Sequence, residues 1–202
     1  MKSKKWTLIL TSLTALTLMT ACGQSTTKSS TTAAADTTAI TTSAKNSQSS
    51  YFTEKDYDTS YDESTASKIE LSGSSASVSG DGVTVSGSTV TISKAGTYVI
   101  SGQSDGVQIK VEADKSDDVK LVFKGATMTN TDAAISATSA GHVYLTLAEG
   151  TTNSLSDSNS NSDEKANAAL FSKVDLTING SGTLNVDGKK SNAIKANDTL
   201  HI

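Results

Sequence analysis

Residues 168–186 read AALFSKVDLTINGSGTLNV, and this stretch decides the class of fold. Apolar and polar residues alternate over VDLTI at 174–178 and again over GTLNV at 182–186. Alternation with a period of two places Val, Leu and Ile on one face of a strand and Asp, Thr or Asn on the other. Glycines between the two runs permit a turn. The stretch therefore predicts two short β-strands joined by a tight connection.

Short alternating runs of this kind continue through most of the sequence after Lys68. Gly, Asn, Asp or Ser residues separate each run from the next. The other runs lie at 83–85, 89–92, 97–100, 107–111, 119–123, 142–147 and 199–202. No segment in this part of the sequence has a convincing helical period. We therefore predict an all-β domain over residues 68–202.

Repetition along the chain helps to choose between two all-β architectures. Small-apolar pairs at 134–135, 169–170 and 193–194 each precede a turn and a short strand. The unit recurs after roughly 20 to 35 residues, which suits one turn of a coil whose strands stack in parallel. We predict a right-handed parallel β-helix, and a β-sandwich with Greek-key turns remains the alternative.

The β-helix predicts which residues share a core. Val143, Leu145 and Leu147 would point into the same core as Val174, Leu176 and Ile178. The two segments would then be parallel neighbours, about 4.8 Å apart in the hydrogen-bonding direction.

The first 21 residues have the layout of an export signal. Lys2, Lys4 and Lys5 precede an apolar run at 6–19, and Cys22 follows two small residues. The run is short for a membrane span and typical of a signal peptide. The region around Cys22 resembles the lipobox of bacterial lipoproteins, which implies cleavage before Cys22 and lipidation of its thiol. We therefore expect a Gram-positive type of lipoprotein, anchored on the outer face of the cytoplasmic membrane. An ordinary secretory signal is the alternative.

A segment rich in Ser, Thr and Ala follows the cysteine, over residues 22–67. It contains too few apolar residues to offset the entropy lost on ordering, so we predict a disordered tether. Its exception is a group of aromatic residues, Tyr51, Phe52, Tyr57 and Tyr61. Clustered aromatic rings can stack on sugar faces, although incidental aromatics in a solvated tether are the simpler interpretation.

Charge and cysteine content narrow the functional classes. The chain has 202 residues and a formal net charge of −4, and all 17 of its basic residues are lysines. A slightly acidic chain without a basic stripe is not a nucleic-acid-binding protein. A single cysteine cannot form an intramolecular disulfide. We expect one monomeric domain that burial and backbone hydrogen bonds stabilise.

Several longer motifs resemble those of one known family. They are IELSG at 69–73, SGDGV at 79–83, KAGTYVISG at 94–102, VKLVFKG at 119–125, LAEGTTN at 147–153 and AALFSKVDLTING at 168–180. In this order they resemble the carbohydrate-binding β-helix lipoproteins of anaerobic and other Gram-positive bacteria, and the resemblance covers residues 68–202. It implies a pectate-lyase-like fold, bound calcium, and binding to an extracellular polysaccharide, cellulose-like or acidic, without cleavage. Because such domains continue with further turns, we expect this chain to be an N-terminal fragment.

Candidate site residues follow from that chemistry. Calcium takes six to eight oxygen ligands, and adjacent carboxylates repel one another unless a cation or solvent screens them. We therefore nominate Asp163, Glu164 and Asp198 as calcium ligands, although a solvated charged loop is the simpler explanation of each of them. Lys173 and Lys195 are nominated as contacts to the glycan, where an ammonium can meet a uronate carboxylate. Solubilising lysines on the polar face of a strand are the simpler explanation of each.

Two other functions remain open. A calcium-dependent polysaccharide lyase needs a base beside the metal; the chain contains no Arg, so a Lys of lowered pKa would have to serve. His142 and His201 both lie in predicted strands, where packing or exposure explains them better than catalysis. We therefore predict no enzyme activity and no catalytic residue. The third possibility is a structural adhesin or surface spacer.

Overall fold

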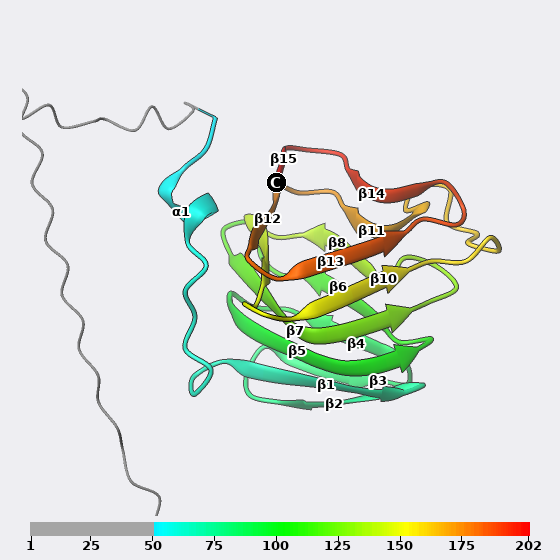
Figure 1. Ribbon diagram of the computed structural model, residues 1–202, viewed down its shortest axis with the longest axis horizontal. Helices are drawn as coiled ribbons and strands as arrows, with labels where there is room; N and C mark the ends of the chain where they lie inside the picture. The colour runs from blue at the N-terminus through cyan, green and yellow to red at the C-terminus, as the bar shows by residue number, and fades with distance from the viewer. Residues whose placement is uncertain (1–50) are drawn as a thin grey trace, which may run out of the picture. The chain divides into compact units, whose positions relative to one another are not determined.

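The computed structural model describes residues 51–202, which fold almost entirely as β-strands arranged in two sheets (Figure 1). The nine-stranded sheet comprises β1 (Ser67–Gly73), β2 (Ser75–Ser79), β5 (Gly96–Asp105), β7 (Asp118–Thr129), β9 (His142–Leu147), β10 (Thr152–Ser156), β12 (Leu176–Gly180), β13 (Thr183–Asp187) and β15 (Leu200–His201). The six-stranded sheet comprises β3 (Val83–Ser86), β4 (Thr89–Ile92), β6 (Gln108–Glu112), β8 (Ile135–Ser139), β11 (Ala168–Ser172) and β14 (Asn192–Ala196). The prediction of an all-β domain is confirmed.

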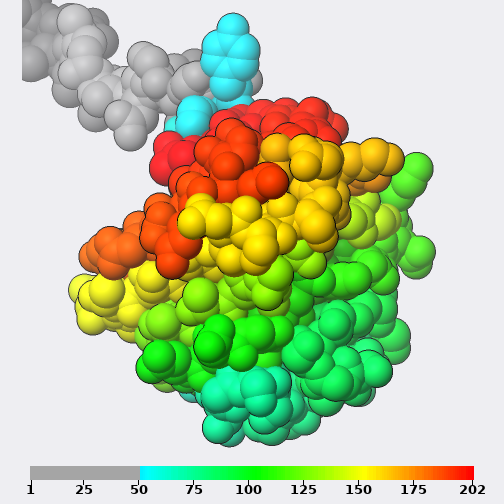
Figure 2. All heavy atoms as spheres, turned by 90° about the vertical axis from the view of Figure 1, so that its right-hand side faces the viewer, coloured from blue at the N-terminus to red at the C-terminus, as the bar shows by residue number. Residues whose placement is uncertain are grey.

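Apart from two hairpins among β1–β4, neighbouring strands of each sheet are parallel. The main path of the first sheet runs β15-β12-β9-β7-β5-β1-β2, and the second sheet runs β14-β11-β8-β6-β4-β3. From β4 on the chain passes repeatedly from one sheet to the other, and each return adds a strand beside an earlier one. Figure 2 shows the result as bands of successive colour, from β2 and β3 at the bottom to β14 at the top.

The predicted pairing of the segments at 142–147 and 174–178 is confirmed. Leu176 pairs with Val143 and Ile178 pairs with Leu145, in parallel register. These side chains belong to one hydrophobic core, against which Val174 also packs. Parallel strands in one sheet are not the antiparallel pairing of a Greek-key sandwich.

The first four strands depart from this parallel pattern. β1 pairs with β2 in an antiparallel hairpin, and β3 pairs with β4 in another. Each hairpin turns at a Gly-Ser pair, Gly73-Ser74 or Gly87-Ser88, with the glycine at φ near +60°. Such two-residue loops with a leading glycine are typical of tight hairpins. Each hairpin places one strand at the edge of a sheet.

A buried asparagine holds the corner between β7 and β10. Asn153 is fully buried, and its Oδ1 accepts hydrogen bonds from the amides of Gly125 and Ala126. Its Nδ2 donates to the Thr151 hydroxyl and to the Thr183 carbonyl. All four hydrogen-bonding positions of the side-chain amide are therefore satisfied, as burial requires.

The outer face of the nine-stranded sheet is covered by residues 51–66, which we call the N-terminal segment. It contains the short helix α1 (Glu54–Tyr57) and runs across several strands (Figure 1). Tyr61 and Ala66 pack on Val99, Val122 and Ala148, which form a second small core. The prediction of a disordered tether as far as residue 67 is therefore wrong for this segment. The remainder of that tether, Cys22 and the export signal lie outside the described residues.

Ion pairs add to this attachment. Lys120 Nζ donates to the Asp58 carboxylate and to the backbone carbonyls of Asp58 and Ser60. Lys124 pairs with Glu63 at 2.6 Å.

Residues 51–202 contain no helix that is long and apolar enough to cross a membrane.

Candidate functional site

A buried carboxylate fixes the N-terminal segment on the sheet. Asp56 is 4% exposed, and its Oδ1 accepts a hydrogen bond from the Thr177 hydroxyl of β12 at 2.5 Å. Its Oδ2 accepts from the amide and the hydroxyl of Thr53, at 2.7 and 2.8 Å. His201 Nδ1 of β15 lies 3.2 Å from Asp56 Oδ1, without the geometry of a hydrogen bond. Carboxylate burial is tolerated here because donors surround the group.

These contacts decide the charge of Asp56. Burial alone would raise its pKa, but the hydrogen bonds from Thr177 and Thr53 and the contact with His201 hold the pKa well below its ordinary value. Asp56 is therefore ionised throughout the physiological range of pH.

His142 and Tyr144 of β9 lie beside this carboxylate on the same outer face. Their rings stack with centroids 4.1 Å apart, and His142 Nε2 lies 2.8 Å from the Thr177 hydroxyl oxygen. Burial lowers the pKa of His142, against the attraction of nearby carboxylates. Burial and the carboxylates Asp118, Asp56 and Asp175 raise the pKa of Tyr144 to about 12. Both side chains are therefore neutral at pH 7.

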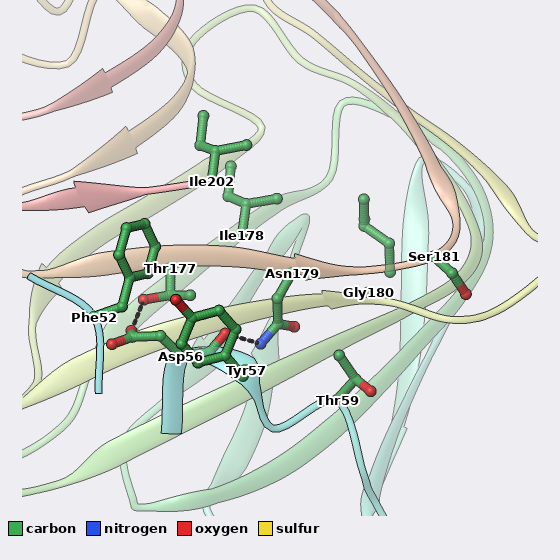
Figure 3. A pocket seen from close by; sticks show the side chains of 11 residues that line it. Phe52, Asp56, Tyr57, Thr59, Thr177, Ile178, Asn179, Gly180, Ser181 and Ile202 are labelled. Atoms are coloured by element: carbon green, nitrogen blue, oxygen red, sulfur yellow. Dashed lines mark hydrogen bonds between the residues drawn. The ribbon is translucent and has the colours of Figure 1, made fainter. Parts of the chain in front are cut away.

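Two hollows flank the α1 part of the N-terminal segment. The first, which we call the apolar hollow, has a volume of about 460 Å³ (Figure 3). Its lining includes Phe52, Tyr57, Ile178 and Ile202, with Asp56 at its polar wall. The rings of Phe52 and Tyr57 are 5.6 Å apart between centroids, and Tyr57 is half exposed.

Polar groups at the margin of the apolar hollow come from the segment and from the turn after β12. Thr59 and Ser181 line it, and neither hydroxyl has a hydrogen-bond partner among residues 51–202. Asn179 also lines it, but its amide is occupied: Nδ2 donates to the carbonyls of Asp56 and Asp58, and Oδ1 accepts from Thr146. An exposed ring beside unpaired hydroxyls is the arrangement that a sugar ring can use.

The second, which we call the polar hollow, has a volume of about 810 Å³ and shares Asp56 with the apolar hollow. It is lined by Tyr51, Thr53, Glu54, Lys55, Asp56, Asp118, Gly141, His142, Tyr144, Asp175, Thr199 and His201. Lys55 Nζ pairs with Asp118 at 2.8 Å, and Asp175 Oδ1 accepts from the Thr199 amide. Four carboxylates against one lysine give this hollow a net negative charge.

The residues nominated from sequence as calcium ligands lie elsewhere. Asp163 and Glu164 belong to the loop between β10 and β11, whereas Asp198 lies in the turn between β14 and β15. Asp163 Oδ1 accepts hydrogen bonds from the amides of Lys165 and Ala166, which lower the pKa of the carboxyl. Within residues 51–202 no three or more His, Cys, Asp or Glu side chains gather as a metal site would require. The three nominated residues do not form such a group.

The nominated glycan contacts Lys173 and Lys195 also lie away from the two hollows. Lys195 of β14 donates to the carbonyl of Lys165 and to Asn167 Oδ1, and its Nζ lies 5.9 Å from the centroid of the Phe171 ring. Lys173 follows β11 and is exposed. Neither lines the apolar or the polar hollow.

Sequence reasoning missed most of the residues around Asp56. It explained His142 and His201 by packing or exposure, whereas the structure brings both to one carboxylate that lies far away in sequence. The aromatic group at 51–61 was the available signal, and two of its rings line the apolar hollow. A second signal is the repeated Asp-x-Ser pattern: Asp58 accepts from Ser60, and Asp62 accepts from Ser64. Such local turns shape a segment instead of leaving it extended.

Comparisons with known proteins bear on this site. A family model described as carbohydrate-binding domain-containing protein matches residues 86–202. A protein of that description from Acetivibrio thermocellus is 36% identical over 116 residues, which are 54% of this chain and 41% of the relative. A solved structure, described as the polysaccharide lyase-like protein from C. thermocellum in a gadolinium derivative, superposes with a TM-score of 0.64 at 34% identity. That match covers 67% of this chain and 57% of the other, so this chain spans only part of the length of both relatives.

Proposed function

Because the chain belongs to the family of carbohydrate-binding domain-containing proteins, we propose that it binds an extracellular polysaccharide, cellulose-like or acidic, without cleaving it. The observation that carries this proposal is the apolar hollow, where the half-exposed Tyr57 ring lies beside Phe52. Thr59 and Ser181 also line it, with hydroxyls that have no partner within residues 51–202. A sugar ring has apolar faces that pack on aromatic rings and hydroxyls at its edge that exchange hydrogen bonds.

The scaffold supports this use. We propose that the stacked parallel strands are turns of a right-handed, pectate-lyase-like β-helix. Such a coil has a fixed spacing of about 4.8 Å between strands, which suits the regular repeat of a glycan chain. A rigid face of this kind reduces the ordering that binding must impose on the protein.

Loss of the exposed ring is expected to weaken glycan binding. Tyr57→Ala removes a stacking partner worth about 0.5–1.5 kcal/mol, so retention on insoluble cellulose or polygalacturonate should fall roughly 3- to 10-fold. Val85→Ala is the control, because Val85 is similarly exposed but lies on β3 of the other sheet. If the parent chain is retained on neither matrix, the binding proposal is wrong. Release of unsaturated oligosaccharides from either matrix would instead favour a lyase.

Calcium support stays a prediction of the family resemblance. Because Asp163, Glu164 and Asp198 do not gather into one group within residues 51–202, the proposed binding does not depend on a metal held by them. The same retention assay, run with calcium and with a chelator, tests the prediction. Equal retention under both conditions would exclude calcium support.

The anchor is a further part of the proposal. We propose that Cys22 carries lipid and that the domain stands on the outer face of the cytoplasmic membrane, where it meets extracellular glycans. Two acyl chains, at about 0.8 kcal/mol per buried CH₂, anchor stably where one is marginal. Cys22→Ala should move the protein from the membrane fraction to the medium or leave it unprocessed. Unchanged membrane retention, measured by fractionation, would contradict the anchor.

A further inference from the structure

The polar hollow is rich in negatively charged hydrogen-bond acceptors. Glu54, Asp118 and Asp175 supply carboxylate oxygens, and one ammonium, Lys55, is already paired with Asp118. Asp175 uses Oδ1 for the Thr199 amide, and its Oδ2 forms no hydrogen bond within residues 51–202. Ionised carboxylates accept hydrogen bonds and cannot donate them. A ligand that brings hydrogen-bond donors or positive charge is therefore favoured in this hollow.

The tautomer of His142 adds one more acceptor. The Thr177 hydroxyl has a single proton, which it donates to the ionised Asp56. His142 Nε2 must therefore be the donor in its 2.8 Å contact with the Thr177 oxygen. Burial lowers the pKa of His142, so the ring is neutral at pH 7 and its Nδ1 carries no proton.

That nitrogen is open to a ligand. Within residues 51–202, His142 Nδ1 has no hydrogen-bond partner and is not among the buried polar atoms that lack one. It therefore faces the hollow as an acceptor, beside the Tyr144 ring on which His142 stacks. Asp56 and Thr177 hold it there, since both fix the donor end of the ring.

We propose that the polar hollow is a glycan subsite that selects by charge, preferring amino sugars with a protonated amine, then neutral sugars, and rejecting uronates. An ammonium has three donors and no acceptor, and hydroxyls can donate, whereas a uronate carboxylate brings only acceptors and a repelling charge. This inference rests on the proposed glycan binding and narrows its ligand, because the negative charge of the hollow disfavours an acidic chain and not a cellulose-like one.

Three ligands with one backbone test the order. A β-1,4-linked glucose hexamer, its 6-carboxyl glucuronate counterpart and the corresponding glucosamine hexamer differ in charge but not in linkage. Calorimetric titration of the full chain at about pH 6.5 should give affinities that fall in the order glucosamine, glucose, glucuronate, with at least a tenfold difference between the extremes.

The acidic net charge of the whole chain also favours this order of affinities. Single-charge variants therefore test whether the preference arises in the polar hollow. Asp175→Asn removes one charge while its Oδ1 can still accept from the Thr199 amide, and it should raise glucuronate affinity at least threefold. Asp187→Asn is the control: it removes one charge from an exposed carboxylate on β13, outside the hollow, and should change the affinities less than twofold.

The ¹⁵N chemical shift of His142 Nδ1 gives a direct readout. It should move when the glucose or glucosamine hexamer binds, because the nitrogen then accepts a hydrogen bond. Glucuronate binding that equals or exceeds that of glucose, or Asp187→Asn acting as strongly as Asp175→Asn, would overturn the inference and leave glycan binding intact. Binding of no ligand would overturn both.

Discussion

Replacing Gly180 by Ala is expected to cost at least about 4 kcal/mol of unfolding free energy, among the largest effects of a single substitution. Gly180 ends β12 at φ +99°, and an added Cβ would overlap the backbone of Leu147, its partner on β9. Main-chain atoms of a paired strand cannot move aside without breaking the parallel register. Urea denaturation of the full chain measures the loss, which would consume much of a typical stability of 5–15 kcal/mol.

A second glycine separates this clash from backbone strain. Gly106 follows β5 at φ +100°, but a Cβ there would meet no atom within 4 Å. Gly106→Ala should therefore lower the free energy of unfolding only by the cost of a left-handed backbone conformation, about 1–2 kcal/mol. Gly102 repeats the Gly180 geometry in the β5–β1 pair, against Leu71, so Gly102→Ala should be as severe as Gly180→Ala. Equal losses for Gly180→Ala and Gly106→Ala would show that stacking does not constrain this corner.

The inner face of the domain could be predicted from the sequence, because the alternation of apolar and polar residues indicates which side chains are buried. Val143, Leu145, Leu176 and Ile178 all lie in the main core. The antiparallel hairpins of β1–β2 and β3–β4 could have been found as well, since Gly87-Ser88 between two short apolar runs is a hairpin signal. Repetition in the rest of the chain favours parallel stacking throughout, whereas the turn residues at these two places favour antiparallel hairpins.

The outer face could not be predicted in the same way. Tyr144, Thr146 and Thr177 alternate with core residues and should face water, yet all three are buried because the N-terminal segment covers this face. The segment is attached chiefly through hydrogen bonds and ion pairs with strands that lie far away in sequence, such as that from Thr177 to Asp56. Composition shows only that this segment has few aliphatic residues. It contains no information on polar partners supplied by distant strands.

The attachment of the N-terminal segment should depend on the hydroxyl of Thr177. Thr177→Val keeps the shape of the side chain but removes the donor to Asp56 and the acceptor for His142. A hydrogen bond to a charged group contributes about 1.5–3 kcal/mol, so the open population of residues 51–60 should rise roughly 10- to 100-fold. Hydrogen exchange of this peptide, followed by mass spectrometry, measures the change without altering the segment itself.

The matched control and the pH dependence make this expectation specific. Thr183→Val changes an exposed threonine on β13, whose hydroxyl has no partner within residues 51–202, and should leave protection of the segment within a factor of about two.

In the parent chain, the pKa of Asp56 is depressed when the segment is attached. The ionised carboxylate therefore stabilises the attached segment fully above the pKa of a free aspartate, about 3.9, and this stabilisation is lost as the pH falls below that value. Protection, corrected for intrinsic exchange, should therefore decrease below about pH 4, and less steeply in Thr177→Val, where the shift is smaller. An unchanged exchange rate in Thr177→Val would mean that the apolar contacts of Tyr61 and Ala66, and not the buried carboxylate, hold the segment on the sheet.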